Sequence, residues 1–333
     1  MNKSFALAAL AGIVLAVALV AWQGFAVVAE AFASVGWGLA LIVVIRVAQV
    51  FGAGLSWWAL VPGIRGFSLW IAVKLRFIRE AINTLLPVAQ VGGDIIGARL
   101  ATFYGGDGGT AGASVLVDLL TQTATQFVFA LVGLGLLVAL GGNETLIFWV
   151  SVGLALMAAA VVGFFFFQRM GGFALVERGL LRLAETAAWG SLAHVANLHD
   201  RLQAIHADNR RVAASFLAHL VTWFVGALEV YVALAFMGHH VDFADAVVIE
   251  SLGHAVRAAG FLVPGALGIQ EGGFIALCAV YAIPAPAALA LSFAKRVPEI
   301  VLGLPALVAW HAIEARPVAP NPAASPAGQQ SPP

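Results

Sequence analysis

The chain has 333 residues, of which 62% are hydrophobic and only 10% are charged, and its formal net charge is +0. A soluble domain carries about 25% charged residues, and a soluble chain of this size could not keep so much apolar surface away from water. The neutral balance excludes the basic field that attracts nucleic acid. The single cysteine, Cys278, excludes a disulfide framework and a thiolate metal site within one chain. We therefore predict an all-α bundle of transmembrane helices with no cofactor, metal or nucleic-acid partner.

Six apolar runs are long enough to cross a bilayer, because a spanning helix needs about 17–25 residues. They cover residues 5–22, 38–60, 111–140, 144–168, 212–237 and 287–311. The first run is longer than the apolar part of a signal peptide, about 7–15 residues, so we interpret it as a retained span. Two further regions, 67–100 and 244–284, are apolar but interrupted by charges, glycine and proline. These segments predict about seven or eight spans. The second interrupted region could form either a re-entrant hairpin plus one span or two full spans.

Lysine and arginine in the connecting segments predict the orientation, because cytoplasmic loops are enriched in these residues. The links 23–36, 141–143 and 238–242 contain neither, whereas the link 61–79 and the segment 169–211 carry four and six of them. We expect both basic segments to be cytoplasmic, with the N-terminus on the same side.

Two segments differ in composition from the spans. In 169–211, apolar residues recur every three or four positions, which predicts a cytoplasmic amphipathic helix on the inner leaflet. The end of the chain, 313–333, is rich in proline, alanine, serine and glutamine and is predicted to be disordered. We therefore expect a single transmembrane domain, 1–312, followed by a tail.

A first cluster of polar residues surrounds a predicted helix break in the region 67–100. Arg79 and Asn83 are four residues apart and share a face if they are helical. Pro87 would end that helix, and Gly92 and Gly93 permit a tight reversal. We predict a helix that ends inside the membrane, turns and returns; the alternative is a cytoplasmic loop whose charges are solvated. The candidate cavity residues here are Arg79, Glu80, Asn83, Gln90, Asp94 and Arg99.

A second cluster has the same order of features. Glu250, His254 and Arg257 lie on one helical face, and a proline and glycine break with an acidic residue follows, namely Pro264, Gly265, Gly268 and Glu271. A charge in mid-bilayer costs about 2.5–3.5 kcal/mol, so such residues are expected to face a polar cavity or pathway. The alternative is a structural salt bridge between helices, which does not exclude a functional role.

Three weaker polar stripes occur in the long apolar runs. A single stripe of this kind is typical of hydrogen bonds between helices, but together they indicate a bundle with a polar interior. We add four of their members, Asp118, Gln122, Arg296 and Glu299, to the candidate cavity; the other members are Gln126, Thr222, Gly226, Glu229 and Lys295. There is no strict sequence repeat. However, two broken, charged segments in corresponding halves are typical of an inverted-repeat transporter.

The two clusters also carry a family resemblance. The stretch IREAINTLLPVAQVGGD at 78–94, followed by GARL at 97–100, resembles the hopanoid-biosynthesis-associated membrane proteins called HpnL. These belong to the wider family of the lysylphosphatidylglycerol synthase transmembrane region, or flippase-like domain. The later stretch PGALGIQEGG at 264–273 is similar to the second signature of that family, and the resemblance covers roughly residues 5–312.

The resemblance implies a bacterial inner-membrane protein that moves or handles a lipid. Its partners would be a hopanoid, a hopanoid-linked lipid or an anionic phospholipid, and other membrane proteins of the hopanoid pathway. Larger relatives carry a C-terminal domain that loads lysine onto phosphatidylglycerol. The resemblance covers the membrane part, so we expect neither such a domain nor aminoacyl-transferase activity.

Three functions remain open at this stage. The first is lipid translocation through the polar groove, and we expect no enzyme activity in that case. The second is a membrane-embedded lipid-modifying enzyme that uses Glu250, His254 and Asp94 as acid and base, although the sequence shows no nucleophile motif, P-loop or metal-ligand motif. The third is a scaffold for hopanoid synthesis, in which neutral replacements of the charged residues would be tolerated.

Overall fold

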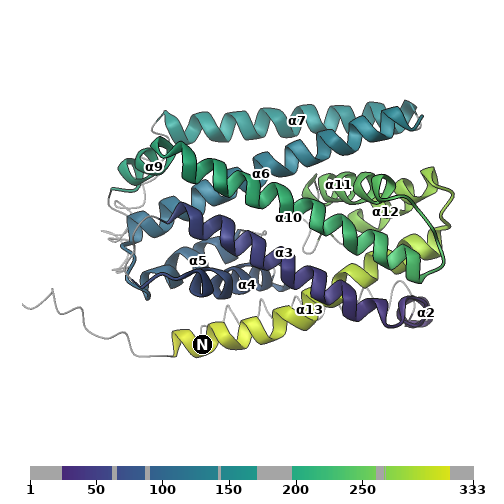
Figure 1. Cartoon of the computed structure of the whole chain (residues 1–333), viewed down its shortest axis with the longest axis horizontal. Coiled ribbons are helices and arrows are strands. Elements are labelled where there is room, and N and C mark those ends of the chain that lie inside the picture. Colours follow the sequence, from purple (N-terminus) through teal and green to yellow (C-terminus); the bar gives the residue numbers. More distant parts are fainter. Residues whose placement is uncertain are drawn as a thin grey trace, which may run out of the picture.

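The computed structural model describes residues 25–61, 66–86, 91–141, 144–170, 197–259, 266 and 268–315. All regular structure in these ranges is helical, as predicted (Figure 1). The helices are α2 (Phe25–Val35), α3 (Gly38–Leu60), α4 (Leu69–Leu85), α5 (Gly92–Thr102), α6 (Gly108–Ala139), α7 (Glu144–Arg169), α9 (Leu198–Ala207), α10 (Asn209–Phe236), α11 (Phe243–Ala259), α12 (Ile269–Val280) and α13 (Ala285–Glu314). The predictions for the run 5–22, for most of the segment 169–211 and for most of the tail lie outside the described residues.

Five of the described helices are long and apolar enough to cross a membrane, namely α3, α6, most of α7, α10 and α13. They correspond to five of the six long apolar runs, which confirms a polytopic helix bundle. The two interrupted regions each form a pair of shorter helices, α4 with α5 and α11 with α12. At about 1.5 Å per residue, α5 and α12 are too short to cross a hydrocarbon core about 30 Å thick. The second interrupted region is therefore a hairpin.

The two halves of the chain repeat one arrangement of helices. Helix α5 begins at Gly92 and α12 at Ile269, while α6 begins at Gly108 and α13 at Ala285, so both pairs are displaced by 177 residues. The packing repeats as well: α4 packs on α13 as α6 packs on α11, and α9 packs on α6 as α2 packs on α13. The unit α2–α6 thus recurs as α9–α13, and α7 links the two units.

The two units run in opposite directions. Helices α3 and α10 pack side by side and are antiparallel, while the hairpins α4–α5 and α11–α12 lie toward opposite ends of the bundle (Figure 1). This is the inverted-repeat arrangement that the two broken segments predicted.

The link 61–79 is only partly a loop, which corrects one prediction. Helix α4 begins at Leu69, and the Ser68 hydroxyl accepts a hydrogen bond from the Ile71 amide at 3.4 Å as an N-cap. Lys74 is exposed, but Arg76 and Arg79 are buried inside the bundle. Counting them as cytoplasmic loop charges was wrong, because both lie on α4 and pair inside the bundle with the buried Asp118.

Helix α9 also departs from its prediction. Leu198, Leu202 and Ile205 are buried against Leu60, Ala113 and Val117 on neighbouring helices. The amphipathic pattern is real, but within the described residues its apolar face covers the bundle rather than the inner leaflet.

Nearby, Asp107 caps α6 and accepts from the Thr110 amide at 2.8 Å. Partial burial acts to raise the pKa of this carboxyl, but the hydrogen bonds from Thr110 and the charge of Arg201 outweigh it and hold the pKa below its usual range.

Candidate functional site

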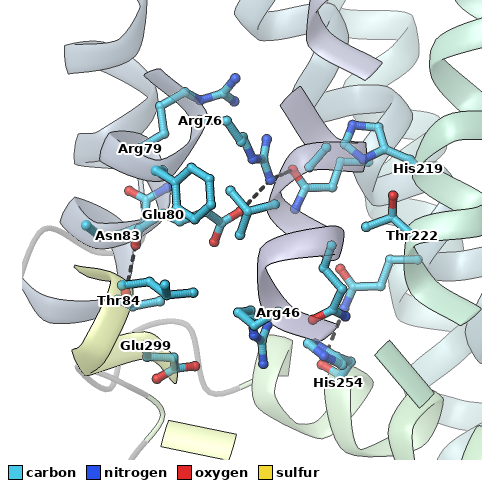
Figure 2. A pocket seen from close by; sticks show the side chains of 18 of the residues that line it. Arg46, Arg76, Arg79, Glu80, Asn83, Thr84, His219, Thr222, His254 and Glu299 are labelled. Carbon is cyan, nitrogen blue, oxygen red and sulfur yellow. Dashed lines mark hydrogen bonds and ion pairs between the residues drawn. The ribbon is translucent and has the colours of Figure 1, made fainter. Parts of the chain in front are cut away.

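A polar cavity of about 290 Å³ lies in the middle of the bundle, among α3, α4, α5, α6, α10, α11 and α13. Figure 2 shows arginines from α3 and α4 around this cavity, together with Glu299 from α13 and two histidines from α10 and α11. Its size is at the lower end of ordinary ligand pockets, about 300–1,000 Å³. It can hold water or a small polar group, and both hairpins contribute side chains to it.

Asp118 on α6 is the centre of the polar network on one side of the cavity. This carboxylate is fully buried and accepts from Arg76 Nη1 at 3.1 Å, from Arg79 Nη1 at 2.8 Å and bonds His219 Nε2 at 2.9 Å. Arg76 also donates to Glu80 at 2.6 Å and to Gln122 at 2.9 Å. The pairs offset the large cost of burying each charge, and they tie α4 to α6 and α10.

Asp94 fixes the first hairpin against its own first helix. Arg79 donates to Asp94 Oδ1 through Nη2 at 2.6 Å and through Nε at 3.0 Å. Asn83 donates to Asp94 Oδ2 at 3.1 Å and accepts from the Gly93 amide at 2.7 Å. A side chain at Gly93 would collide with the Arg79 carbonyl and with Asn83, so glycine is required there for α5 to approach α4. Arg79 and Asn83, which the sequence placed on one helical face, therefore both bind α5.

Lys295 on α13 is the centre of the network on the other side. Its ammonium group lies 2.8 Å from Glu229 on α10 and 2.8 Å from Glu250 on α11. Glu229 also accepts from Arg46 on α3 at 2.8 Å, and Glu250 bonds His254 at 3.0 Å. These residues join four helices through buried charges.

Two further ion pairs hold the second hairpin on α13. Arg257 donates to Glu299 at 2.6 Å and to Gln270 at 2.9 Å. Glu271 accepts from Arg296 at 2.7 Å and from the Gly268 amide at 2.7 Å. Gly268 has a φ of +80°, a conformation that favours glycine. The acidic residue thus caps the start of α12 and fixes it to α13.

The described lining of the cavity has an excess of positive charge. It includes four arginines, at positions 46, 76, 79 and 257, and three carboxylates, at positions 80, 94 and 299. No described group of three or more histidine, cysteine or acidic side chains could hold a metal ion. Each of these arginines already donates to a carboxylate, so an anion would bind by sharing these guanidinium groups. The geometry is therefore suited to an anionic or hydrated polar group.

Comparison with known proteins places the chain in a family. The model of the lysylphosphatidylglycerol synthase transmembrane region matches residues 9–305. The chain belongs to this family. The match confirms the resemblance at the family level, and it agrees with a membrane domain related to lipids. No curated protein and no solved structure is similar enough to match the chain.

For this family member, the structure brings most of the predicted site residues together. Those that line the cavity are Arg79, Glu80, Asn83, Asp94, Gln122, His254, Arg257 and Glu299. Asp118 and Glu250 lie behind it as buried partners, and Glu271 and Arg296 form the adjacent pair of the second hairpin. Gly92, Gly93 and Gly268 lie at the helix breaks, while Pro87, Gln90, Pro264 and Gly265 lie outside the described residues.

Arg99 is the exception. Its side chain is 57% exposed, and its nearest carboxylate is Glu314 at 3.8 Å. It does not line the cavity, because it lies in the last turn of α5, beyond the part of the hairpin that faces α4.

Sequence reasoning missed several residues of the site. Arg46 is the one charged residue of its apolar run, and His219 lies three residues before the polar stripe that begins at Thr222; both line the cavity. An isolated charge inside a span is itself a signal of function, so Arg46 could have been found. His219 and Arg76 were harder to predict, because the partner of both, Asp118, is distant in sequence.

Proposed function

We propose that this protein moves a lipid between the leaflets of the membrane, with the headgroup in the cavity and the apolar part in the bilayer. The observation that carries the proposal is the charged cavity where two hairpins from opposite ends of the bundle meet. A headgroup in bare hydrocarbon would lose its hydration without compensation. Fixed charges in the bundle interior provide the polar path that transporters of inverted-repeat type use.

The excess of arginine supports an anionic headgroup. A guanidinium bonds phosphate oxygens in pairs and stays charged at any physiological pH. We propose an anionic phospholipid, a hopanoid or a hopanoid-linked lipid as the cargo, the last two in line with the HpnL resemblance. Other membrane proteins of hopanoid synthesis are the proposed partners.

The charges outside the bundle support an orientation. Arg99, Arg201 and Arg211 lie at the end of the bundle where α5 ends and α10 begins. The links at the other end, 36–37, 140–141 and 237–242, contain no lysine or arginine. By the positive-inside rule, we propose that the basic end is cytoplasmic, in a bacterial inner membrane, with the N-terminus on the cytoplasmic side.

Lipid exchange in liposomes tests this function directly. The purified protein would be reconstituted in vesicles that carry fluorescent lipids with anionic, zwitterionic or hopanoid headgroups, and a membrane-impermeant quencher would report the outer leaflet. We expect faster exchange, with a preference for anionic headgroups that is lost in Arg46→Gln and Arg257→Gln. Arg99→Gln is the matched control, because it removes an arginine outside the cavity. No acceleration with any headgroup would refute the proposal.

Two carboxylate–histidine pairs favour a second candidate, a lipid-modifying enzyme. His219 bonds Asp118 at 2.9 Å, His254 bonds Glu250 at 3.0 Å, and both imidazoles line the cavity. Such pairs can serve in proton transfer. Mass spectrometry of lipids from a deletion strain separates the two functions, because an enzyme would leave a product missing and a translocase would leave it on the wrong leaflet. Full function after neutral replacement of Arg79, Asp94 and Arg257 would favour a scaffold over both.

A further inference from the structure

A second hollow lies on the outside of the bundle, between α4 and α13. It has a volume of about 400 Å³ and is lined by apolar side chains, including Trp70, Val73, Pro305 and Ala309, with Lys74 as the one charged residue of the described lining. Trp70 is 72% exposed and Lys74 is also exposed. The groove therefore faces the region where lipid surrounds the bundle.

The groove and the polar cavity share a wall. Phe77 on α4 and Leu302 on α13 line both of them. Neither side chain is fully buried. A molecule with an apolar chain in the groove would have its polar end at this wall, next to the arginines.

One end of the groove lies near a membrane surface. Trp70 and Lys74 are in the first turns of α4, at the end of the bundle that carries the basic loops (Figure 1). Tryptophan is enriched at the level of lipid headgroups, and an exposed lysine there attracts anionic lipid. The groove thus begins in the leaflet that borders the basic end.

The equivalent seam in the other repeat is covered. Within the described residues, α7 packs on both α6 and α11, and no helix takes the equivalent place beside α4 and α13. Helix α13 also contains Pro298 and Pro305, while the α6 sequence contains no proline. Proline removes a backbone hydrogen bond and weakens the helix locally. Within the described residues, one seam is therefore covered by α7, while the other borders a helix that two prolines weaken.

We propose that the groove between α4 and α13 binds the acyl chain of an anionic glycerophospholipid, whose headgroup enters the cavity between Phe77 and Leu302. This rests on the proposed function and specifies its cargo and entrance. The lipid comes from the leaflet at the basic end of the bundle, and the seam beneath α7 takes no part in entry.

Photocrosslinking tests the groove independently of transport. The full chain in nanodiscs would be irradiated with phosphatidylglycerol that carries a diazirine in its acyl chain, and the labelled peptides would be identified by mass spectrometry. We expect labels on α4 and α13 that unlabelled phosphatidylglycerol displaces. Ala309→Trp should fill the groove and reduce them about tenfold, the effect of losing ~1.4 kcal/mol of binding free energy. Leu156→Trp on the exposed face of α7 is the matched control and should change nothing.

Three outcomes would overturn the inference. Labels spread evenly over α6, α7 and α10 would show ordinary annular lipid. Displacement by a hopanoid but not by phosphatidylglycerol would exclude the acyl chain as the occupant. Lipid exchange in liposomes without labels in the groove would refute lipid binding in the groove but not the proposed function. Labels in the groove without lipid exchange would refute the proposed function but not lipid binding in the groove. The wild-type labelling pattern decides these cases even if Ala309→Trp does not fold.

Discussion

The two inverted repeats share their geometry but differ in the sign of their charges. Asp118 on α6 and Lys295 on α13 are separated by the same 177 residues that separate the starts of their helices. Asp118 is surrounded by Arg76, Arg79 and His219, while Lys295 lies between Glu229 and Glu250. Equivalent backbone positions thus hold an anion among cations and a cation among anions.

The two repeats therefore share a backbone arrangement without sharing the sign of their central buried charge. The hairpins keep the same acidic character, because Asp94 and Glu271 are also equivalent and each ties the start of a returning helix to a neighbouring helix. The central residues differ, although the four arginines that line the cavity are divided equally between the Asp118 network and the networks around α13. A symmetric backbone therefore carries charge networks of opposite sign around one cavity.

The largest expected effect is that of Asp118→Asn. It leaves Arg76 and Arg79 buried with one fewer carboxylate, and removing one member of a buried ion pair costs about 3–5 kcal/mol. We expect the free energy of unfolding in detergent to fall by that amount, measured by denaturant titration with tryptophan fluorescence. The double variant Asp118→Asn with Arg76→Gln should lose less than the sum of the two single variants. Strict additivity would contradict the shared network.

Lys295→Met should lower the free energy of unfolding by less than Asp118→Asn does, although it is the equivalent change in the other repeat. In both variants the remaining charges keep one partner each, but Asp118 bonds three side chains whereas Lys295 bonds only two. We expect a loss of about 1.5–3 kcal/mol, the range for hydrogen bonds to charged groups, in the same titration. A larger loss of unfolding free energy with Lys295→Met than with Asp118→Asn would contradict this comparison.

The sequence predicted the repeat more clearly than the networks. Proline and glycine breaks at two places indicated both hairpins, because these residues act on the local backbone. Arg79 and Asn83 were paired correctly from their helical spacing, since four residues bring two side chains onto one face. His219 and Arg46 were missed because their partners, Asp118 and Glu229, lie on other helices. Spacing along one helix gives no information about which helix faces it.

Two glycines test the difference between the seams. At Gly133 on α6, an added Cβ would collide with the buried Ser251 side chain of α11, whereas at Gly303 on α13 it would meet Leu85 Cδ1 at 2.6 Å. The Leu85 side chain can change its rotamer to make room. Ser251 Oγ lies close to the backbone of α11 and can move less. We expect Gly133→Ala to cost about 1–3 kcal/mol, as overpacking does, and Gly303→Ala to cost less in the same titration. Equal costs would argue that α4 and α13 pack as rigidly as α6 and α11.

The smallest effect is expected at Arg99, and it bears on what makes a charge part of the site. Arg99 and Arg79 occur in the same polar cluster of the sequence, but Arg99 is exposed and its pair with Glu314 spans 3.8 Å. Exposed ion pairs contribute about 0–1 kcal/mol, so Arg99→Gln should leave the free energy of unfolding and the rate of lipid exchange close to those of the wild type. Arg79→Gln should reduce both, because it breaks the pairs with Asp94 and Asp118. A large loss of exchange with Arg99→Gln would mean that the basic end of the bundle, and not only the buried network, takes part in moving the headgroup.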